Sequence, residues 1–260
     1  MIIYIPTRGR ADNQVTLSFF PEDMRKDVVL VIDEDEKHLY ENKYDCKYMV
    51  IPEEIKGIAK KRQYIHKHTE DKKIVMLDDD LRFYIRKSPT DWHLRYLEPE
   101  EYKALFGLLD KWLDDYAHVG VSAREGNNRV EHLAVENTRY MRVLGYNLDM
   151  FDNVELGRVD VMEDFDINLQ LLRQGKSSKI SYYYAQGQKS SNAEGGCSEW
   201  RTIEVHNAGA EKLHALHPDF VKVVEKETKT AWNGMPRKDV NVQWKRAYNS
   251  GADKLQGGLF

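Results

Sequence analysis

Short apolar runs alternating with helical stretches are the feature of this 260-residue sequence that most restricts its fold. The first half predicts strands at residues 2–6, 27–33, 46–52 and 72–78, and a helix at 57–68 between the last two. Strands separated by helices favour βαβ units and a largely parallel sheet with both faces buried. The sequence therefore predicts an α/β fold.

The second half continues this pattern. It predicts helices at 98–117 and 163–175 and strands at 118–124 and 179–185. After these we expect a Gly/Ser-rich loop at 187–198, a helix to about residue 216, a second helix beginning near Pro218, and a strand at 240–248 with a loose tail. We expect a single domain, in which a core (1–185) is completed by a helical C-terminal part (186–260).

The composition is that of a soluble globular protein, with 41% hydrophobic and 32% charged residues. No apolar run approaches the roughly 20 residues that a membrane span needs. The first residues, MIIYIPTRGR, do not have the pattern of a secretory signal. Only two cysteines are present, Cys46 and Cys197, which predicts no disulfide framework. We expect a cytoplasmic protein with no membrane partner.

The net charge of −4 hides an uneven distribution. Residues 56–87 contain ten Lys or Arg against five Asp or Glu, and residues 221–250 contain seven against three. Solvated helix faces explain such segments, and so does a positive surface for a polyanion such as DNA.

Three consecutive aspartates, Asp78, Asp79 and Asp80, follow the apolar run of the fourth predicted strand. Adjacent carboxylates repel one another, so they need either a solvated, capped turn or a bound cation. Asp78 and Asp80 form a D-x-D spacing that suits Mg²⁺ or Mn²⁺, which proteins hold with one or two carboxylates, substrate phosphates and water. An isolated triplet of this kind is more often a capped turn.

Polar residues at other strand ends favour a ligand site. In open α/β sheets ligands bind beyond the carboxyl ends of the strands. Thr7, Arg8 and Arg10 follow the first predicted strand, and Asp33 ends the second. Arginines and carboxylates on one rim suit an anionic ligand held partly through a metal.

A second acidic motif, Glu163-Asp164, opens the helix at 163–175. Carboxylates at a helix N-terminus are stabilised by the helix dipole, which fits either an ordinary cap or a proton acceptor. Arg62 lies on the helix at 57–68, where it either reaches a nucleotide or belongs to an exposed basic face. Gly195 and Gly196 lie in a loop that leads into a helix, where backbone N–H groups could hold phosphate.

In combination, these pieces resemble a GT-A glycosyltransferase, the nucleotide-sugar-binding α/β fold. The matching segments are YIPTRGR, VID, GIAKKRQYI, IVMLDDD and MEDFDINLQLLRQG, over roughly residues 1–185. Within that fold, IPTRGRADNQ, SSNAEGGCSEWRT and NGMPRKDVNVQWKR are most similar to the phage TET-associated glycosyltransferases, relatives of the trypanosome base J glucosyltransferase.

The resemblance implies a mostly parallel, twisted sheet flanked by helices. It also implies metal-dependent, inverting transfer from a UDP-sugar, UDP-glucose or UDP-GlcNAc, to 5-hydroxymethylpyrimidine, chiefly 5-hydroxymethylcytosine, in DNA. Asp80 and Asp78 would bind Mn²⁺ or Mg²⁺, with His206 as a candidate third ligand, and Asp164 beside Glu163 would be the general base. The side chains that would hold the uridine diphosphate are Thr7, Arg8, Arg10, Asp33, Arg62 and Asp78, with Gly195 and Gly196 at the phosphates.

Two other functions remain open from the sequence. One is a GT-A transferase that acts on a glycan, lipid or protein. The other is a non-catalytic protein of the same fold that binds DNA or a partner. Charge segregation favours DNA over a glycan acceptor, and the presence of both acidic motifs argues against a non-catalytic copy. If the gene belongs to a phage, the host cytoplasm is the expected compartment.

Overall fold

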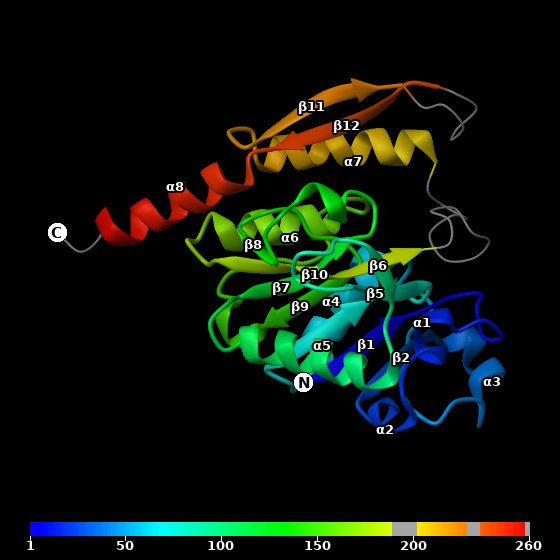
Figure 1. Cartoon of the computed structure of the whole chain (residues 1–260). Helices are drawn as coiled ribbons and strands as arrows, with labels where there is room; N and C mark the ends of the chain where they lie inside the picture. Colours follow the sequence, from blue (N-terminus) through cyan, green and yellow to red (C-terminus); the bar gives the residue numbers. More distant parts are fainter. Residues whose placement is uncertain (189–201, 228–234, 258–260) are drawn as a thin grey trace.

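The computed structural model describes residues 1–188, 202–227 and 235–257, and Figure 1 shows the arrangement of its elements. The strands are β1 (Ile2–Pro6), β2 (Val28–Asp33), β3 (Lys47–Ile51), β4 (Lys73–Leu77), β5 (Leu81–Arg86), β6 (Leu94–Tyr96), β7 (His118–Ala123), β8 (Ala134–Glu136), β9 (Val143–Asn147), β10 (Ser178–Gln188), β11 (Val221–Lys226) and β12 (Arg237–Val242). The α-helices are α1 (Val15–Ser18), α2 (Glu22–Arg25), α3 (Lys37–Tyr40), α4 (Ile58–His68), α5 (Pro99–Trp112), α6 (Glu163–Leu172), α7 (Ile203–Leu216) and α8 (Trp244–Gly257). Short 3₁₀ helices are η1 (Glu34–Glu36), η2 (Asn127–Arg129) and η3 (Leu148–Met150).

A ten-stranded sheet forms the centre of the described chain, in the order β3-β2-β1-β4-β9-β7-β10-β5-β6, with β8 paired to β10. The strands β1 to β4, β7 and β10 run in one direction, and β6 shares it because both β6 and β10 are antiparallel to β5. Strands β5, β8 and β9 run the opposite way. The predicted mostly parallel α/β sheet is confirmed.

Helices cover both faces of this sheet, which explains the uninterrupted apolar run of β4. Val75 and Leu77 pack into the core on the α5 side, whereas Ile74 and Met76 pack into the core on the α4 and α6 side. All four side chains are fully buried. A strand buried on both faces has no solvent-facing position for a polar residue. The chain therefore becomes polar only where β4 reaches the edge of the sheet.

The C-terminal part forms a further layer over α6, in which α7 packs against the β11–β12 hairpin and α8 packs against α6 (Figure 1). Two predictions were wrong here. The segment after Pro218 is the strand β11, and the strand expected at 240–248 is the end of β12 followed by α8. Trp244, Ala247 and Tyr248 recur at helical spacing and pack into the cluster shared with α6.

Gly251 explains why α8 approaches α6 so closely. A Cβ atom at this position would lie 2.6 Å from the carbonyl oxygen of Leu172 and 2.3 Å from the amide nitrogen of Gly175. Only glycine fits this approach. The glycines of the tail, interpreted from the sequence as a loose end, therefore include one that allows a helix to pack.

Strand β10 runs across the boundary placed after residue 185 between the two expected parts of the domain. In the described ranges, no helix is long and apolar enough to cross a membrane.

Candidate active site

The three aspartates form the turn between β4 and β5, and the backbone of this turn is fixed by one buried side chain. The hydroxyl of Thr16 in α1 donates to the carbonyl oxygen of Asp78 (2.7 Å) and accepts from the amide of Leu81 (2.8 Å). The Thr16 amide donates to the carbonyl oxygen of Asp79 (3.0 Å). The backbone polar groups are therefore satisfied without the carboxylates, which are available for other contacts.

Asp79 points inward and anchors the loop after β1. Its carboxylate accepts from the Thr7 hydroxyl at 2.6 Å and pairs with Arg10. Asp79 is 7% exposed, and burial raises its pKa to about 6 although Arg10 and Thr7 oppose the shift. The middle aspartate thus joins β1 to the turn. Sequence alone assigned it no role.

Asp80 points toward the edge of the sheet. Its carboxylate lies 3.2 Å from the Arg10 guanidinium and accepts from the side-chain amide of Gln188 at 2.8 Å. Arg10 thus pairs with both Asp79 and Asp80. The Asp80 side chain keeps 18% of its surface exposed, so one edge of it remains accessible to a ligand.

Arg62 in α4 joins the two acidic motifs, which are 85 residues apart in the sequence from Asp78 to Glu163. Its guanidinium lies 2.9 Å from the Asp78 carboxylate and also pairs with Glu163, the first residue of α6. Arg62 is 3% exposed, so this contact is shielded from solvent. Arg62 therefore brings the two acidic motifs together in the structure.

Burial controls the protonation of these carboxylates. Burial raises the pKa of Asp78 to about 6, although the charge of Arg62 acts in the opposite direction. Burial also raises the pKa of Asp164, while Arg62 and Arg139 lower it. A carboxyl whose pKa is raised toward neutrality is a better proton acceptor than an ordinary surface aspartate.

The remaining predicted residues of the rim form a second ion-pair group at the ends of β1 and β2. Asp33 pairs with Arg8, and its carboxylate lies 2.5 Å from the Lys61 ammonium. Arg8 also pairs with Asp35 at 3.0 Å, and Lys61 donates to the carbonyl oxygen of Thr7 at 3.2 Å. Sequence reasoning missed Lys61, although its position beside Arg62 on an otherwise apolar helix face was a usable signal.

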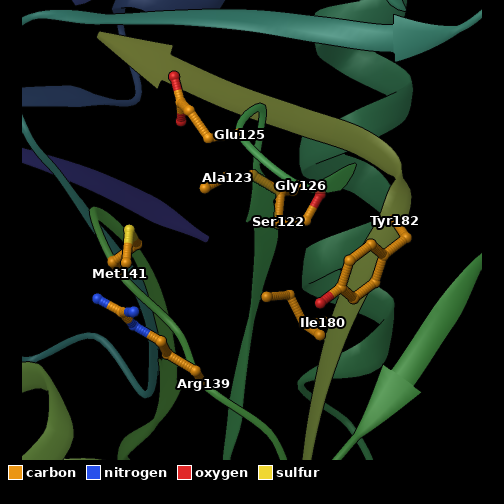
Figure 2. Close-up of a pocket in the computed structure, with 9 residues that line it drawn as sticks. Ser122, Ala123, Glu125, Gly126, Arg139, Met141, Ile180 and Tyr182 are labelled. Carbon is orange, nitrogen blue, oxygen red and sulfur yellow. The ribbon is translucent and has the colours of Figure 1, made fainter. Parts of the chain in front are cut away.

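A cavity of about 160 Å³ lies beyond the carboxyl end of β7 (Figure 2). Its walls come from β7 and the loop after it, from β10, and from the loop that leads into β9. The lining residues are Val121, Ser122, Ala123, Glu125, Gly126, Arg139, Met141, Ile180 and Tyr182. Figure 2 shows Arg139 and Met141 on one side of the cavity and Tyr182 on the other.

Arg139 connects this cavity with the start of α6. Its guanidinium carbon lies 4.7 Å from the centre of the Phe165 ring, and Phe165 directly follows Asp164. The charges of Arg139 and Asp164 influence each other's pKa. No sequence pattern marked Arg139, because it lies in an irregular loop.

Of the remaining predicted residues, His206 is described and is not brought into this arrangement. His206 is buried at 3% exposure on α7, and no group of three or more His, Cys, Asp or Glu within the described residues could hold a metal ion. Gly195 and Gly196 lie outside the described residues. These assignments stay predictions.

The mostly parallel sheet with helices on both faces has the architecture of the GT-A fold. The sequence matches the model of the TET-Associated Glycosyltransferase family over residues 1–196, and the chain belongs to that family.

Relatives of known activity come from two bacteriophages. The beta-glucosyl-HMC-alpha-glucosyl-transferases of Enterobacteria phages T6 and T2 are each 26% identical over 231 residues, which is 83% of this chain and 80% of theirs. Among solved structures, S. aureus TarS in complex with UDP has a TM-score of 0.51 and 15% identity, over 83% of this chain and 65% of the TarS chain. A mycobacterial protein also has a TM-score of 0.51, with 8% identity, over 92% of this chain and 83% of its own. At these identities the structural matches establish the fold alone.

Proposed function

We propose that this glycosyltransferase moves a sugar from a UDP-sugar to the hydroxyl of a 5-hydroxymethylpyrimidine, chiefly 5-hydroxymethylcytosine, in DNA. The observation that carries the proposal is the contact of Arg62 with both Asp78 and Glu163, which supports one shared site for the two acidic motifs. The names of the phage relatives refer to HMC, and UDP is bound in the TarS structure.

The proposed reaction inverts the anomeric carbon of the sugar. The acceptor hydroxyl oxygen forms a bond to that carbon while the bond from the carbon to the diphosphate oxygen breaks, and its electron pair leaves with UDP. Asp164 takes the proton of the acceptor hydroxyl, with Glu163 beside it held by Arg62. Burial raises the pKa of Asp164, which makes it a stronger base than an exposed aspartate.

The residues at the turn fit a divalent cation. Asp78 and Asp80 offer carboxylate oxygens at the edge of the sheet, with 27% and 18% of their side chains exposed. Mg²⁺ and Mn²⁺ take such oxygen ligands, and Mg²⁺ commonly binds one or two carboxylates together with substrate phosphates. When bound, the cation would neutralise charge on the departing diphosphate. Arg8, Arg10 and Lys61 are the side chains that would contact the nucleotide around it, together with Thr7, Asp33 and Arg62.

The cavity lined by Arg139 is the proposed position of the acceptor. Its volume of about 160 Å³ is below the roughly 300–1,000 Å³ of pockets for drug-sized ligands, so it suits one ring rather than a nucleotide sugar. The Tyr182 ring and the Ser122–Gly126 segment form walls for a flat base, and Arg139 and Glu125 supply charged groups. A base that enters this cavity has to leave the helix stack, which costs a few kcal/mol.

The acceptor and the donor are tested together. The protein is incubated with Mn²⁺, a panel of UDP-sugars, and DNA that contains cytosine, HMC or glucosyl-HMC, and the nucleosides are then analysed by mass spectrometry. Glucosyl-HMC is included because the relatives' names contain glucosyl groups together with HMC. We expect the mass of one sugar to be added only to DNA that carries a hydroxymethylpyrimidine or its glucosylated form.

UDP-sugar turnover without transfer to any of these DNAs would refute the proposal and favour a glycan, lipid or protein acceptor. If the product carries the sugar in the anomeric configuration of the donor, the inverting mechanism is wrong.

A further inference from the structure

A row of arginines and aromatic rings, in which Phe19, Tyr96 and Arg124 are exposed, lies on β5, β6 and the segments next to them. We call it the arginine–aromatic row and define it as Phe19, Arg82, Tyr96, Tyr84 and Arg124. The Arg82 guanidinium carbon lies 5.2 Å from the centre of the Phe19 ring and 5.9 Å from that of Tyr96. Tyr96 stacks on Tyr84 at 4.9 Å, and Arg124 lies 5.5 Å from the Tyr84 ring centre. Each ring or cation thus contacts the next.

The row is unusual because it leaves large apolar rings in solvent. Tyr96 is 53% exposed and Phe19 is 40% exposed, and both are among the most exposed large apolar side chains of the described residues. Exposed aromatic rings next to cations are the composition of surfaces that bind nucleic-acid strands, in which bases stack on rings and phosphates pair with arginine.

The charges of the row are not neutralised by ion pairs. Over the described ranges, neither Arg82 nor Arg124 forms a salt bridge, and their side-chain hydrogen bonds go to the hydroxyls of Tyr96 (3.3 Å) and Tyr84 (3.4 Å). The negative charge of Glu125, which lines the cavity, raises the pKa of Arg124. The neighbouring Arg95 differs, because it pairs with Glu101 through two hydrogen bonds of 2.7 and 2.6 Å. Within the described part of the chain, the two cations of the row therefore have no carboxylate partner that would compete with phosphate.

The row also connects the two parts of the proposed active site. Arg82 lies two residues after Asp80 and is in register with Gly187, whose neighbour Gln188 donates to Asp80. At the other end, Arg124 lies between Ala123 and Glu125, which both line the cavity. Gly187 makes this arrangement compact, because a Cβ atom there would lie 3.3 Å from both Arg124 and Tyr84.

We propose that the arginine–aromatic row binds the DNA strand on either side of the modified nucleotide, with Arg82 and Arg124 on phosphates and Tyr96 and Phe19 against bases or sugars. This inference rests on the proposed function. It places the DNA surface on β5, β6 and Arg124, so Arg82 is the one cation of the basic segment 56–87 that takes part, and segment 221–250 supplies none. Several other cations of segment 56–87 are less available than its composition suggests. Lys61 and Arg62 are buried in ion pairs, and Arg86 is fully buried with hydrogen bonds to the carbonyl oxygens of Asn127 and Val130.

The test is DNA affinity as a function of salt, measured by fluorescence anisotropy with a duplex that carries HMC. The double variant Arg82→Gln/Arg124→Gln should reduce the magnitude of the negative slope of log affinity against log salt by about two. At 0.1 M salt its affinity should fall by roughly tenfold or more, because each phosphate contact contributes a slope of about −0.9. Tyr96→Ala should weaken binding by about fivefold or more through lost stacking.

The matched controls separate this surface from other basic residues. Arg95→Gln removes an exposed arginine of β6, next to Tyr96, that already pairs with Glu101. This variant should leave DNA affinity unchanged. Lys245→Gln/Arg246→Gln removes two exposed cations of α8, and it should lower affinity less than the row variant does. Binding of UDP and the circular-dichroism melting curve show that each variant is folded.

Either of two results would overturn the inference: an unchanged salt slope in the row variant, or a larger loss in the α8 variant. Both are measured on binding and need no sugar transfer. A wild-type protein that binds HMC DNA through the row but transfers no sugar to it would refute the proposed function and leave the row assignment standing.

Discussion

Two groups of cationic side chains lie at the carboxyl edge of the sheet, and they are held in opposite ways. On the β1–β2–β4 side, Arg10, Lys61 and Arg62 are buried and each pairs with carboxylates. On the β5–β6 side, Arg82 and Arg124 stack on rings, and in the described structure neither pairs with a carboxylate.

The difference separates two tasks. A buried network of opposite charges has one geometry and resists rearrangement, because removal of one member leaves another charge desolvated. It suits precise placement of a metal, a diphosphate and a base. Solvated arginines held by rings keep their charge available for a long, flexible polyanion.

The largest effect is expected at the start of α6. Asp164→Asn removes the proposed base and should lower turnover about 10²- to 10⁴-fold, which is the typical contribution of general base catalysis. Single-turnover kinetics with HMC DNA measures this loss. Asp160→Asn, at an exposed position shortly before the same helix, is the control and should keep wild-type turnover. Equal activity of the two variants would remove Asp164 from the mechanism.

The buried network is tested next through stability. Arg62→Met leaves Asp78 and Glu163 without their shared cation, and loss of one partner of a buried pair typically costs about 3–5 kcal/mol of unfolding free energy. Chemical denaturation measures the loss. Lys72→Met breaks the exposed pair with Asp149 at 2.8 Å and should leave the denaturation midpoint unchanged. Similar midpoints for both variants would show that the Arg62 network does not stabilise the fold.

A smaller effect is expected on the pH dependence. Asp164 has to be ionised to accept a proton, so kcat/KM falls as the pH falls through its pKa. Burial raises that pKa and Arg139 lowers it. Arg139→Gln should therefore move the acid limb of the kcat/KM profile to higher pH, while Arg95→Gln should leave it in place. A shift of the limb to lower pH would contradict the proposed influence of Arg139 on Asp164.

The sequence predicted the sheet and the grouping of polar side chains at its edge, because both follow from local patterns. Apolar runs of β-strand length identified β1 to β4. The polar residues that follow these strands placed Thr7, Arg10 and Asp78–Asp80 at one edge of the sheet. Contacts between distant residues could not be read in this way. That Arg62 joins Asp78 to Glu163 depends on how α4 and α6 pack, which no local pattern contains.

The failures have a similar cause. The segment near Pro218 has no long periodic pattern, and its strand conformation depends on pairing with β12. The count of Lys and Arg in segment 56–87 overestimated the positive charge at the surface, because Lys61, Arg62 and Arg86 are buried. The arginine–aromatic row escaped notice because its five members come from four separate segments. Conversely, local reasoning left Asp79 without a role, although its burial against Thr7 and Arg10 fixes the turn.

The central claim is that the aspartate turn and the α6 carboxylates share one active site but have separate tasks there. Its most direct test is isothermal titration of UDP with and without Mn²⁺, on the wild-type protein and on Asp80→Asn and Asp164→Asn. We expect Mn²⁺ to strengthen UDP binding to the wild-type protein and to Asp164→Asn, and to have no such effect on Asp80→Asn. Mn²⁺-dependent UDP binding that survives in Asp80→Asn, or that is lost in Asp164→Asn, would contradict the account.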